Sequence, residues 1–505
     1  MNGHSAERPP VSVEATAACQ DVTGVGGQGD GRGAEDDCKK KAQVRAGELR
    51  VARVRSPERP PFVPGTRRTE RQATRQHRLK LGLWFVFAVF SIMALNLNGI
   101  VSMAFGRERL FSGIALLLSI AAAALLLDTA VLGIRGSGRW LLGALGTYLV
   151  IGTVVETASG NGSDFSVAGG LLITIGLAVI GMASGAAAEE IGITERALAL
   201  AVGPLALGAL SVYFSPMIPG LYRRVSVDLD QDRLSGVWGN PNEAALMGCY
   251  ALALLLALPK PRRLPLVPVV LQVALLGAIV LTFSRGGIVG AVLLLILAAV
   301  SGAALKTGRR LRIWALVAPA AWASALLWGV VGGGEGSVAL RSSQARRLQD
   351  LTDIARFGEM EDDKTGSRLA LGAIGLEMWL ESPFVGNGLG QMQEMKRAGG
   401  LGAHNTFLVL LGEAGVVPFA LFAVWLVKYS NLAKWRSSEV LSRFCILTGV
   451  VVFQTCMTGH NMLTQRVAIL VIAFGSGAQA VKRRSVARRW RARALVRSAM
   501  GAGLG

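Results

Sequence analysis

A series of long apolar blocks limits the fold of this chain more than any other feature. Each block runs for about 17–25 residues with few charges, which lets one helix cross a hydrocarbon core roughly 30 Å thick. A segment inside a bilayer must satisfy its backbone polar groups internally, so blocks of this length predict transmembrane helices. The first block begins at Leu81, too far from the N-terminus for a cleavable signal peptide, and is expected to be the first span.

The blocks predict an all-α polytopic membrane protein with about twelve transmembrane helices. Only 17% of the 505 residues are charged, which is low for a soluble chain. The predicted spans are 81–103, 110–134, 140–157, 167–184, 196–214, 241–258, 264–282, 286–305, 312–332, 405–427, 442–458 and 463–480. They form one transmembrane domain over residues 80–482, with a large external loop at about 334–403 between the ninth and tenth spans.

Basic segments flank the apolar region and contribute much of the formal net charge of +20. Residues 1–79 are rich in Gly, Pro, Arg and Glu and poor in aromatic residues, so we expect a disordered, basic cytoplasmic tail. Residues 483–505 are expected to form a second basic cytoplasmic tail, and both tails favour anionic lipids. Nucleic-acid binding is disfavoured because the flanks lack stacking aromatic residues.

The charges of the connecting loops predict the orientation. Loops expected on the same side as the N-terminus contain cations such as Arg135, Lys260, Lys306 and Lys428, whereas the outward loop at 158–165 has no Lys or Arg. By the positive-inside rule, both termini of this multi-pass protein are expected to be cytoplasmic. Two loops are exceptions to this pattern: the first outward loop, which contains Arg107 and Arg109, and the mildly acidic loop at 185–195.

Two polar clusters fall at predicted outer helix ends. In the first, Gly-Asn240-Pro-Asn242-Glu243, Asn240 can cap a helix, Glu243 can complete the cap three residues on, and the free N–H groups can bind a phosphate. The second is Ser284-Arg285-Gly-Gly, where an outward arginine can bind phosphate oxygens in bidentate fashion and the glycines let a headgroup approach the backbone. An interfacial arginine can equally extend to the lipid headgroups.

A third cluster lies in the large loop. Arg368, the first residue of a predicted amphipathic helix at 368–381, would supply a second cation for a pyrophosphate. The apolar stripe of this helix, which includes Leu376 and Leu380, is expected to lie on the membrane or to cover the bundle. The run Gly-Asn-Gly-Leu-Gly at 386–390 is interpreted as a flexible turn.

The fourth cluster contains His404 and Asn405 at the start of a span. His460 also precedes an asparagine at an outer helix end, and the other two of the four histidines lie in the N-terminal tail. An imidazole with an ordinary pKa near 6.5 is a natural acceptor for a proton from a sugar hydroxyl, although a lone histidine is more often structural and Asn405 can simply cap. The histidines and five cysteines show no metal-site spacing, so no metal or cofactor is expected.

Taken in order, the four clusters resemble the O-antigen ligase and polysaccharide-polymerase family. The resemblance covers roughly residues 236–480 and rests on VWGNPNEAA, LTFSRGG, SRLALGAIGLEMWLESPFVGNGLGQ and AHNTFLVLLGEAGVVPF. It implies a multi-pass protein of a bacterial inner membrane. It also implies a metal-independent glycosyltransferase that takes a glycan from undecaprenyl pyrophosphate. The acceptor would be lipid A-core in a ligase and a further glycan repeat in a polymerase.

The resemblance also implies roles for the residues of the clusters. Arg285 and Arg368 would hold the donor pyrophosphate, and His404 would orient or deprotonate the acceptor hydroxyl. Residues expected to support the substrate site are Asn240, Asn242, Ser284, Asn405 and, by placement alone, His460. The alternative function is a transporter or flippase of a small anion or lipid-linked sugar, for which the main mid-span charges are Asp128 and Glu413.

Overall fold

The computed structural model describes residues 67–105, 110–160, 165–217, 234–238, 240–259, 266–300, 362–392, 402–403, 405–434, 437, 439–458 and 462–502. Several predictions fall outside these residues. They are the N-terminal tail up to 66, the ninth span at 312–332 and the part of the external loop at 334–361.

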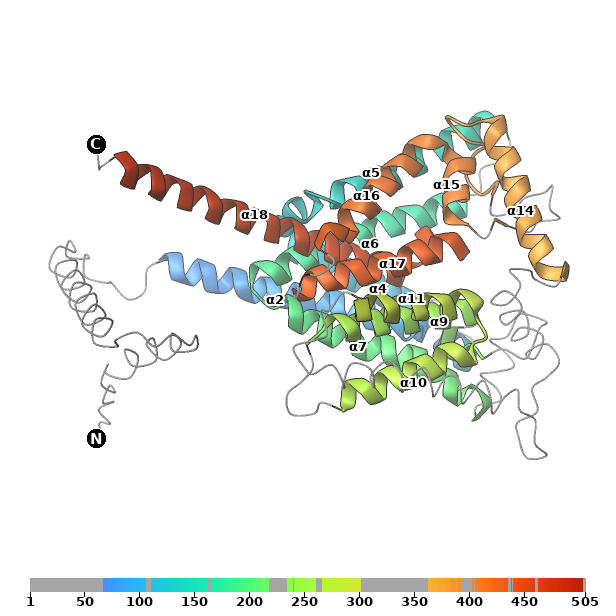
Figure 1. Ribbon diagram of the computed structural model, residues 1–505, viewed down its shortest axis with the longest axis horizontal. Coiled ribbons are helices and arrows are strands. Elements are labelled where there is room, and N and C mark those ends of the chain that lie inside the picture. Colours follow the sequence, from blue (N-terminus) through green and yellow to red (C-terminus); the bar gives the residue numbers. More distant parts are fainter. Residues whose placement is uncertain are drawn as a thin grey trace, which may run out of the picture. The chain divides into compact units, whose positions relative to one another are not determined.

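All regular secondary structure among the described residues is helical, which confirms the all-α prediction (Figure 1). The helices are α2 (Arg67–Ala94), α3 (Leu97–Phe105), α4 (Leu110–Ile134), α5 (Gly138–Ala158), α6 (Phe165–Glu190), α7 (Thr194–Leu210), α9 (Pro241–Ala257), α10 (Val267–Leu281), α11 (Arg285–Val300), α14 (Asp362–Glu381), α15 (Thr406–Ala414), α16 (Val416–Ser430), α17 (Val440–Thr458) and α18 (Arg466–Ala502). Short 3-10 turns are η1 (Ser211–Met217), η2 (Gly236–Trp238), η4 (Leu432–Lys434) and η5 (Met462–Thr464).

Six of the described helices are long and apolar enough to cross a membrane. They are Gln72–Ala94, Leu110–Ile134, Gly138–Ala158, Ser166–Glu190, Thr194–Phe214 and Val440–Thr458. Shorter apolar helices cover Pro241–Ala257, Val267–Leu281, Arg285–Ala298 and Val416–Ser430. The chain is therefore a multi-pass membrane protein, and the number of twelve spans stays a prediction.

Two predicted spans are each divided into two helices. The span at 81–103 breaks at Asn96, whose φ is 45° and whose Nδ2 donates to the carbonyl of Val237 at 2.5 Å. The span at 405–427 breaks at Gly415, which has φ 77°. A Cβ on Gly415 would lie 2.0 Å from the carbonyl oxygen of Phe384, so the segment after α14 fills the break between α15 and α16.

Close backbone contact between α6 and α18 forms the centre of the bundle. A Cβ on Gly185 of α6 would lie 1.9 Å from the carbonyl oxygen of Phe474, and one on Gly477 of α18 would lie 2.0 Å from that of Met182. In a membrane, small residues let helices approach until their backbones touch, and van der Waals packing then holds them together. Figure 1 shows α5, α16 and α17 beside this pair, with α7, α9, α10 and α11 below it.

The three ion pairs among the described residues all involve α2 or α18. Arg75 pairs with Glu190 at 2.9 Å, Arg78 pairs with Asp128, and Lys482 pairs with Glu439 at 2.5 Å. The acidic partners lie late in α4, at the end of α6 and just before α17. This end of the bundle is called the ion-pair end below. Glu190, from the mildly acidic segment at 185–195, is thus paired with a cation of α2.

Candidate active site

A side-chain hydrogen bond joins the first turns of α9 and α11. Ser284 donates from Oγ to Oδ1 of Asn242 at 2.9 Å. Each helix also has its own cap: Asn240 Oδ1 accepts from the N–H of Asn242 at 2.8 Å, and Ser284 Oγ accepts from the N–H of Gly287 at 3.3 Å. The first two predicted clusters therefore lie side by side, and Asn240, Asn242 and Ser284 belong to one contact group.

Arg285 is the first residue of α11 and is partly exposed. The glycines after it serve helix packing, because a Cβ on Gly286 would lie 2.8 Å from Oγ1 of Thr458 and one on Gly287 would lie 2.4 Å from Cβ of Ala245. The glycine pair lets α11 approach α17 and α9 closely. This corrects the expectation that the pair opens the backbone to a lipid headgroup.

Two further hydrogen bonds attach α18 and α15 to the same region. Gln465, the residue before α18, donates from Nε2 to Oε1 of Glu243 at 3.0 Å. The side chain of Glu243 therefore bonds to the residue before α18 rather than completing the cap of α9. The N–H of Met462, at the start of η5, donates to Oγ1 of Thr406 at 3.0 Å. Since η5 directly precedes Gln465, the helices α9, α11, α15 and α18 all begin in one region.

Asn405 caps α15, as its position before a helix predicted. Its Oδ1 accepts from the N–H groups of Phe407 at 2.9 Å and Leu408 at 3.2 Å. His404 and His460 lie outside the described residues, as does the side chain of Arg368 within α14. The roles of these three residues stay predictions.

The predicted amphipathic helix exists as α14, but the stripe singled out from the sequence is its exposed side. Leu376 is 44% exposed and Leu380 is 61% exposed, whereas Leu371 and Met378 are buried. The buried residues pack toward α15 and the turn that follows α14. Thus α14 lies against the protein through other residues, which rules out the predicted stripe as the face that covers the bundle. That the stripe lies on the membrane stays a prediction.

The glycine-rich turn after α14 is held firmly in place, which corrects its interpretation as flexible. Gly386, Gly388 and Gly390 have φ values of 73°, 101° and 83°, in the left-handed region that suits glycine. Asn387, between the first two of these glycines, donates from its backbone N–H to the carbonyl of Gly412 in α15 at 2.8 Å. Its Nδ2 donates to the carbonyl of Met378 in α14 at 2.7 Å. The turn therefore joins α14 to α15.

The sequence patterns did not predict that two buried carboxyl groups belong to this region. Glu413 is fully buried and accepts from the hydroxyl of Tyr148 at 2.5 Å and from the N–H of Met392 at 3.1 Å. Glu156, at the end of α5, accepts from Nε2 of Gln391 at 3.2 Å. Both carboxyl groups therefore fix the end of the turn after α14, at Gln391 and Met392. Glu413 alone had been noted from the sequence, as a mid-span charge.

The arrangement suits an anionic ligand. Each helix N-terminus carries about half a positive charge, and the caps described above satisfy only some of its first N–H groups. The N-termini of α9, α11, α15 and α18 lie together here, and Arg285 adds a full positive charge at the N-terminus of α11. A phosphate or pyrophosphate group is the ligand that such a region favours. Among the described residues, no group of three or more His, Cys, Asp or Glu could hold a metal ion.

A comparison with sequence families gives a match that overlaps this region. Residues 270–423 match the family model described as O-antigen ligase, Wzy_C. The match runs from α10 into α16. It contains five predicted site residues: Ser284, Arg285, Arg368, His404 and Asn405. No curated protein matches the chain.

The match agrees with the resemblance seen in the sequence motifs. It indicates a membrane ligase or polymerase that transfers glycans, with a lipid-linked glycan and an acceptor as substrates. The apolar helices independently indicate a multi-pass membrane protein, and the family match suggests a bacterial one. The match over residues 270–423 therefore supports an O-antigen ligase-like family for this chain.

Proposed function

We propose that the chain is a glycosyltransferase that moves a glycan from undecaprenyl pyrophosphate to an acceptor on the outer face of the inner membrane. The acceptor is lipid A-core, a growing polysaccharide or a similar hydroxyl compound. The observation that carries this proposal is the common origin of α9, α11, α15 and α18 around Arg285. Of these helices, α11 and α15 lie inside the region that matches the O-antigen ligase family.

In the proposed reaction the acceptor hydroxyl oxygen attacks the anomeric carbon of the donor glycan. The bond between this carbon and the pyrophosphate oxygen breaks, and polyprenyl pyrophosphate leaves with the electron pair. His404 takes the proton of the acceptor hydroxyl. Arg285 and Arg368 stabilise the negative charge that develops on the leaving group, so the step needs no metal. Asn240, Ser284 and Asn405 support the site by capping its helices.

The placement of the ion pairs supports an external site. Asn242 and Ser284 lie at the opposite end of α9 and α11 from the ion-pair end, where α2 begins and α18 leaves the bundle. The positive-inside pattern assigns the ion-pair end to the cytoplasm. The candidate site then faces the outside, where a lipid-linked glycan would meet its acceptor.

A transporter remains the alternative function, but its main supporting residues have structural partners. Asp128 pairs with Arg78, and both carboxylate oxygens of Glu413 accept hydrogen bonds. A charge that binds a substrate or relays a proton is expected to line a pathway, whereas the contacts of these two carboxylates are accounted for by protein partners. These contacts therefore favour glycan transfer.

Complementation in cells tests the proposal. The chromosomal copy is deleted and replaced by the wild type or by Arg285→Ala, Arg368→Ala or His404→Ala, and surface glycans are resolved by gel. We expect the wild type to restore a glycan band or ladder and each variant to fail. Short uncapped chains in the deletion strain would indicate a polymerase, and long unattached chains would indicate a ligase.

The matched control is Arg135→Ala, which removes an exposed arginine at the turn after α4. This variant should complement fully, and all variants must reach equal levels in the membrane. Unchanged glycans after deletion, or full complementation by all three site variants, would refute the proposed function. A transporter would then be the leading hypothesis.

A further inference from the structure

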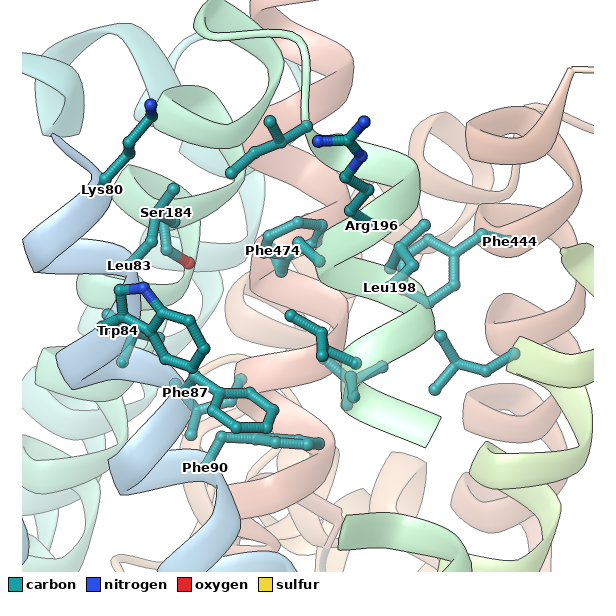
Figure 2. Close-up of a pocket in the computed structure, with 18 residues that line it drawn as sticks. Lys80, Leu83, Trp84, Phe87, Phe90, Ser184, Arg196, Leu198, Phe444 and Phe474 are labelled. Atoms are coloured by element: carbon teal, nitrogen blue, oxygen red, sulfur yellow. The ribbon is translucent and has the colours of Figure 1, made fainter. Parts of the chain in front are cut away.

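We propose that a groove between α2, α7 and α18 binds an anionic phospholipid at the end of the bundle opposite the candidate active site. The groove has a volume of about 310 Å³, and Figure 2 shows the side chains that surround it. This volume is at the lower end of those found for small-molecule sites, which suits part of one acyl chain. The proposal concerns a second site and does not depend on the glycan-transfer reaction.

The wall of the groove is apolar and open to the surroundings of the bundle. Trp84, Phe87 and Phe90 follow one another along one face of α2, and Phe474 of α18 lies across from them (Figure 2). Trp84 is 59% exposed, and Leu200 on the α7 side is 50% exposed. An acyl chain from the surrounding bilayer can therefore enter sideways without crossing a polar surface.

Two cationic side chains, Lys80 and Arg196, lie at one edge of this apolar wall. Figure 2 shows Lys80 and Arg196 on opposite sides of the same edge, beyond the aromatic rings. Both side chains are exposed, and neither forms a hydrogen bond or ion pair within the part of the chain that the structure describes. A phosphate group above the acyl chain would be able to contact both.

Nearby acidic residues already have other partners. Glu190 pairs with Arg75, and Glu189 accepts a 2.7 Å hydrogen bond from Thr194. Glu195, beside Arg196 in the chain, also interacts electrostatically with Arg443. These contacts leave the two groove cations available to an external anion. The charge of the groove edge therefore favours an anionic lipid over a zwitterionic one.

The start of α7 gives independent support at the same edge. Ile193, the residue before α7, lines the groove and provides no side-chain cap, so the first N–H groups of this helix of 17 residues lack a side-chain acceptor. Arg196 and Ala197, in the first turn of α7, line the groove as well. A lipid phosphate here would accept from the helix terminus as well as from the cations.

The groove edge is far from the candidate active site. Lys80 lies sixteen residues before Asn96 in the chain, which corresponds to roughly 24 Å along a helix at 1.5 Å per residue. Asn96 contacts Val237, close to the cap of α9 at Asn240. The edge with Lys80 therefore adjoins the opposite membrane leaflet, where a phospholipid rather than the glycan donor would supply the phosphate.

Native mass spectrometry of the purified full chain tests this proposal. Detergent-solubilised protein is titrated with phosphatidylglycerol or with phosphatidylcholine of the same acyl chains. We expect tighter binding of phosphatidylglycerol, and about thirtyfold weaker binding after Lys80→Gln together with Arg196→Gln, because two cations near an anionic headgroup are lost. The control combines Arg135→Gln with Arg488→Gln, which removes the same charge from exposed positions outside the groove.

A second variant tests the apolar part of the site. Ala201→Phe narrows the groove while both cations remain, and it should also weaken phosphatidylglycerol binding. The control variant should bind as the wild type does. Equal affinity for the two lipids, or unchanged binding in the variant without Lys80 and Arg196, would overturn the proposal. A mass that corresponds to two copies of the chain without bound lipid would also overturn the proposal.

Discussion

The hydroxyl of Ser284 donates a hydrogen bond of 2.9 Å to the amide oxygen of Asn242, 42 positions earlier in the chain. The same hydroxyl oxygen accepts from the N–H of Gly287 and so caps α11. Through these two contacts Ser284 fixes both the start of α11 and its distance from the start of α9. The orientation of Arg285, the next residue, therefore depends on a contact between two helices.

Replacement of Ser284 by alanine should reduce both stability and glycan transfer. We expect Ser284→Ala to lower the free energy of unfolding by about 1–2 kcal/mol, because a helix cap and an interhelical hydrogen bond are lost. The apparent Tm in detergent and the surface glycan pattern measure the two effects. Ser119→Ala is the control, because that hydroxyl donates only within its own helix, to Ala115. Equal losses in both variants would contradict the role of Ser284.

The buried hydroxyl of Tyr148 should stabilise the fold through Glu413. Tyr148→Phe is expected to cost about 1.5–3 kcal/mol, since it removes a donor to a buried carboxyl group. Tyr250→Phe is a matched control, because the hydroxyl of Tyr250 is fully buried and has no hydrogen-bond partner within the described residues. Thermal unfolding should show a lower Tm for the first variant and an equal or higher Tm for the second. The reverse order would refute this assignment.

The turn after α14 should not tolerate a side chain at Gly388. A Cβ there would lie 2.3 Å from Oε2 of Glu156, at a φ of 101°. We expect Gly388→Ala to destabilise the protein by about 1–3 kcal/mol through backbone strain alone, and to speed proteolysis near the turn. Gly372→Ala in α14 has open space around its new Cβ and should be neutral or slightly stabilising. Equal proteolysis rates in the two variants would count against a fixed turn.

The contact between Thr406 and Met462 should matter more for activity than for expression. Thr406→Val keeps the shape of the side chain but leaves the N–H of Met462 without its acceptor, so the segments next to His404 and His460 would shift. We expect a clear loss of glycan transfer at a normal membrane level. Thr455→Val is the control, because Thr455 bonds only within α17. Wild-type transfer by the Thr406 variant would show that this contact does not position the site.

Local sequence patterns predicted the helices well where a single apolar run forms a single helix. The span predicted at 110–134 coincides with α4 because no residue in it disturbs the helix. The breaks at Asn96 and Gly415 were missed because both depend on partners distant in the sequence, namely Val237 and Phe384. An apolar run does not reveal which neighbour will interrupt it.

The site shows the same division between local and distant contacts. Capping by Asn240 and Asn405 could be predicted, since a cap contacts its own helix within three residues. The contact between Glu243 and Gln465 could not be, because it joins residues 222 positions apart. The pair Tyr148 and Glu413 is separated by 265 positions. Such pairs depend on how the helices pack, which no local spacing encodes.

Transfer by the purified chain tests the central claim most directly. The wild type, Arg285→Ala and the control Arg135→Ala are reconstituted in proteoliposomes with a polyprenyl-pyrophosphate-linked glycan and an acceptor, and the initial rate of product formation is measured. We expect transfer by the wild type, a loss of roughly a hundredfold for Arg285→Ala and an unchanged rate for the control, because Arg285 stabilises the departing pyrophosphate. Absence of transfer by the wild type, or an equal rate for Arg285→Ala, would contradict the account.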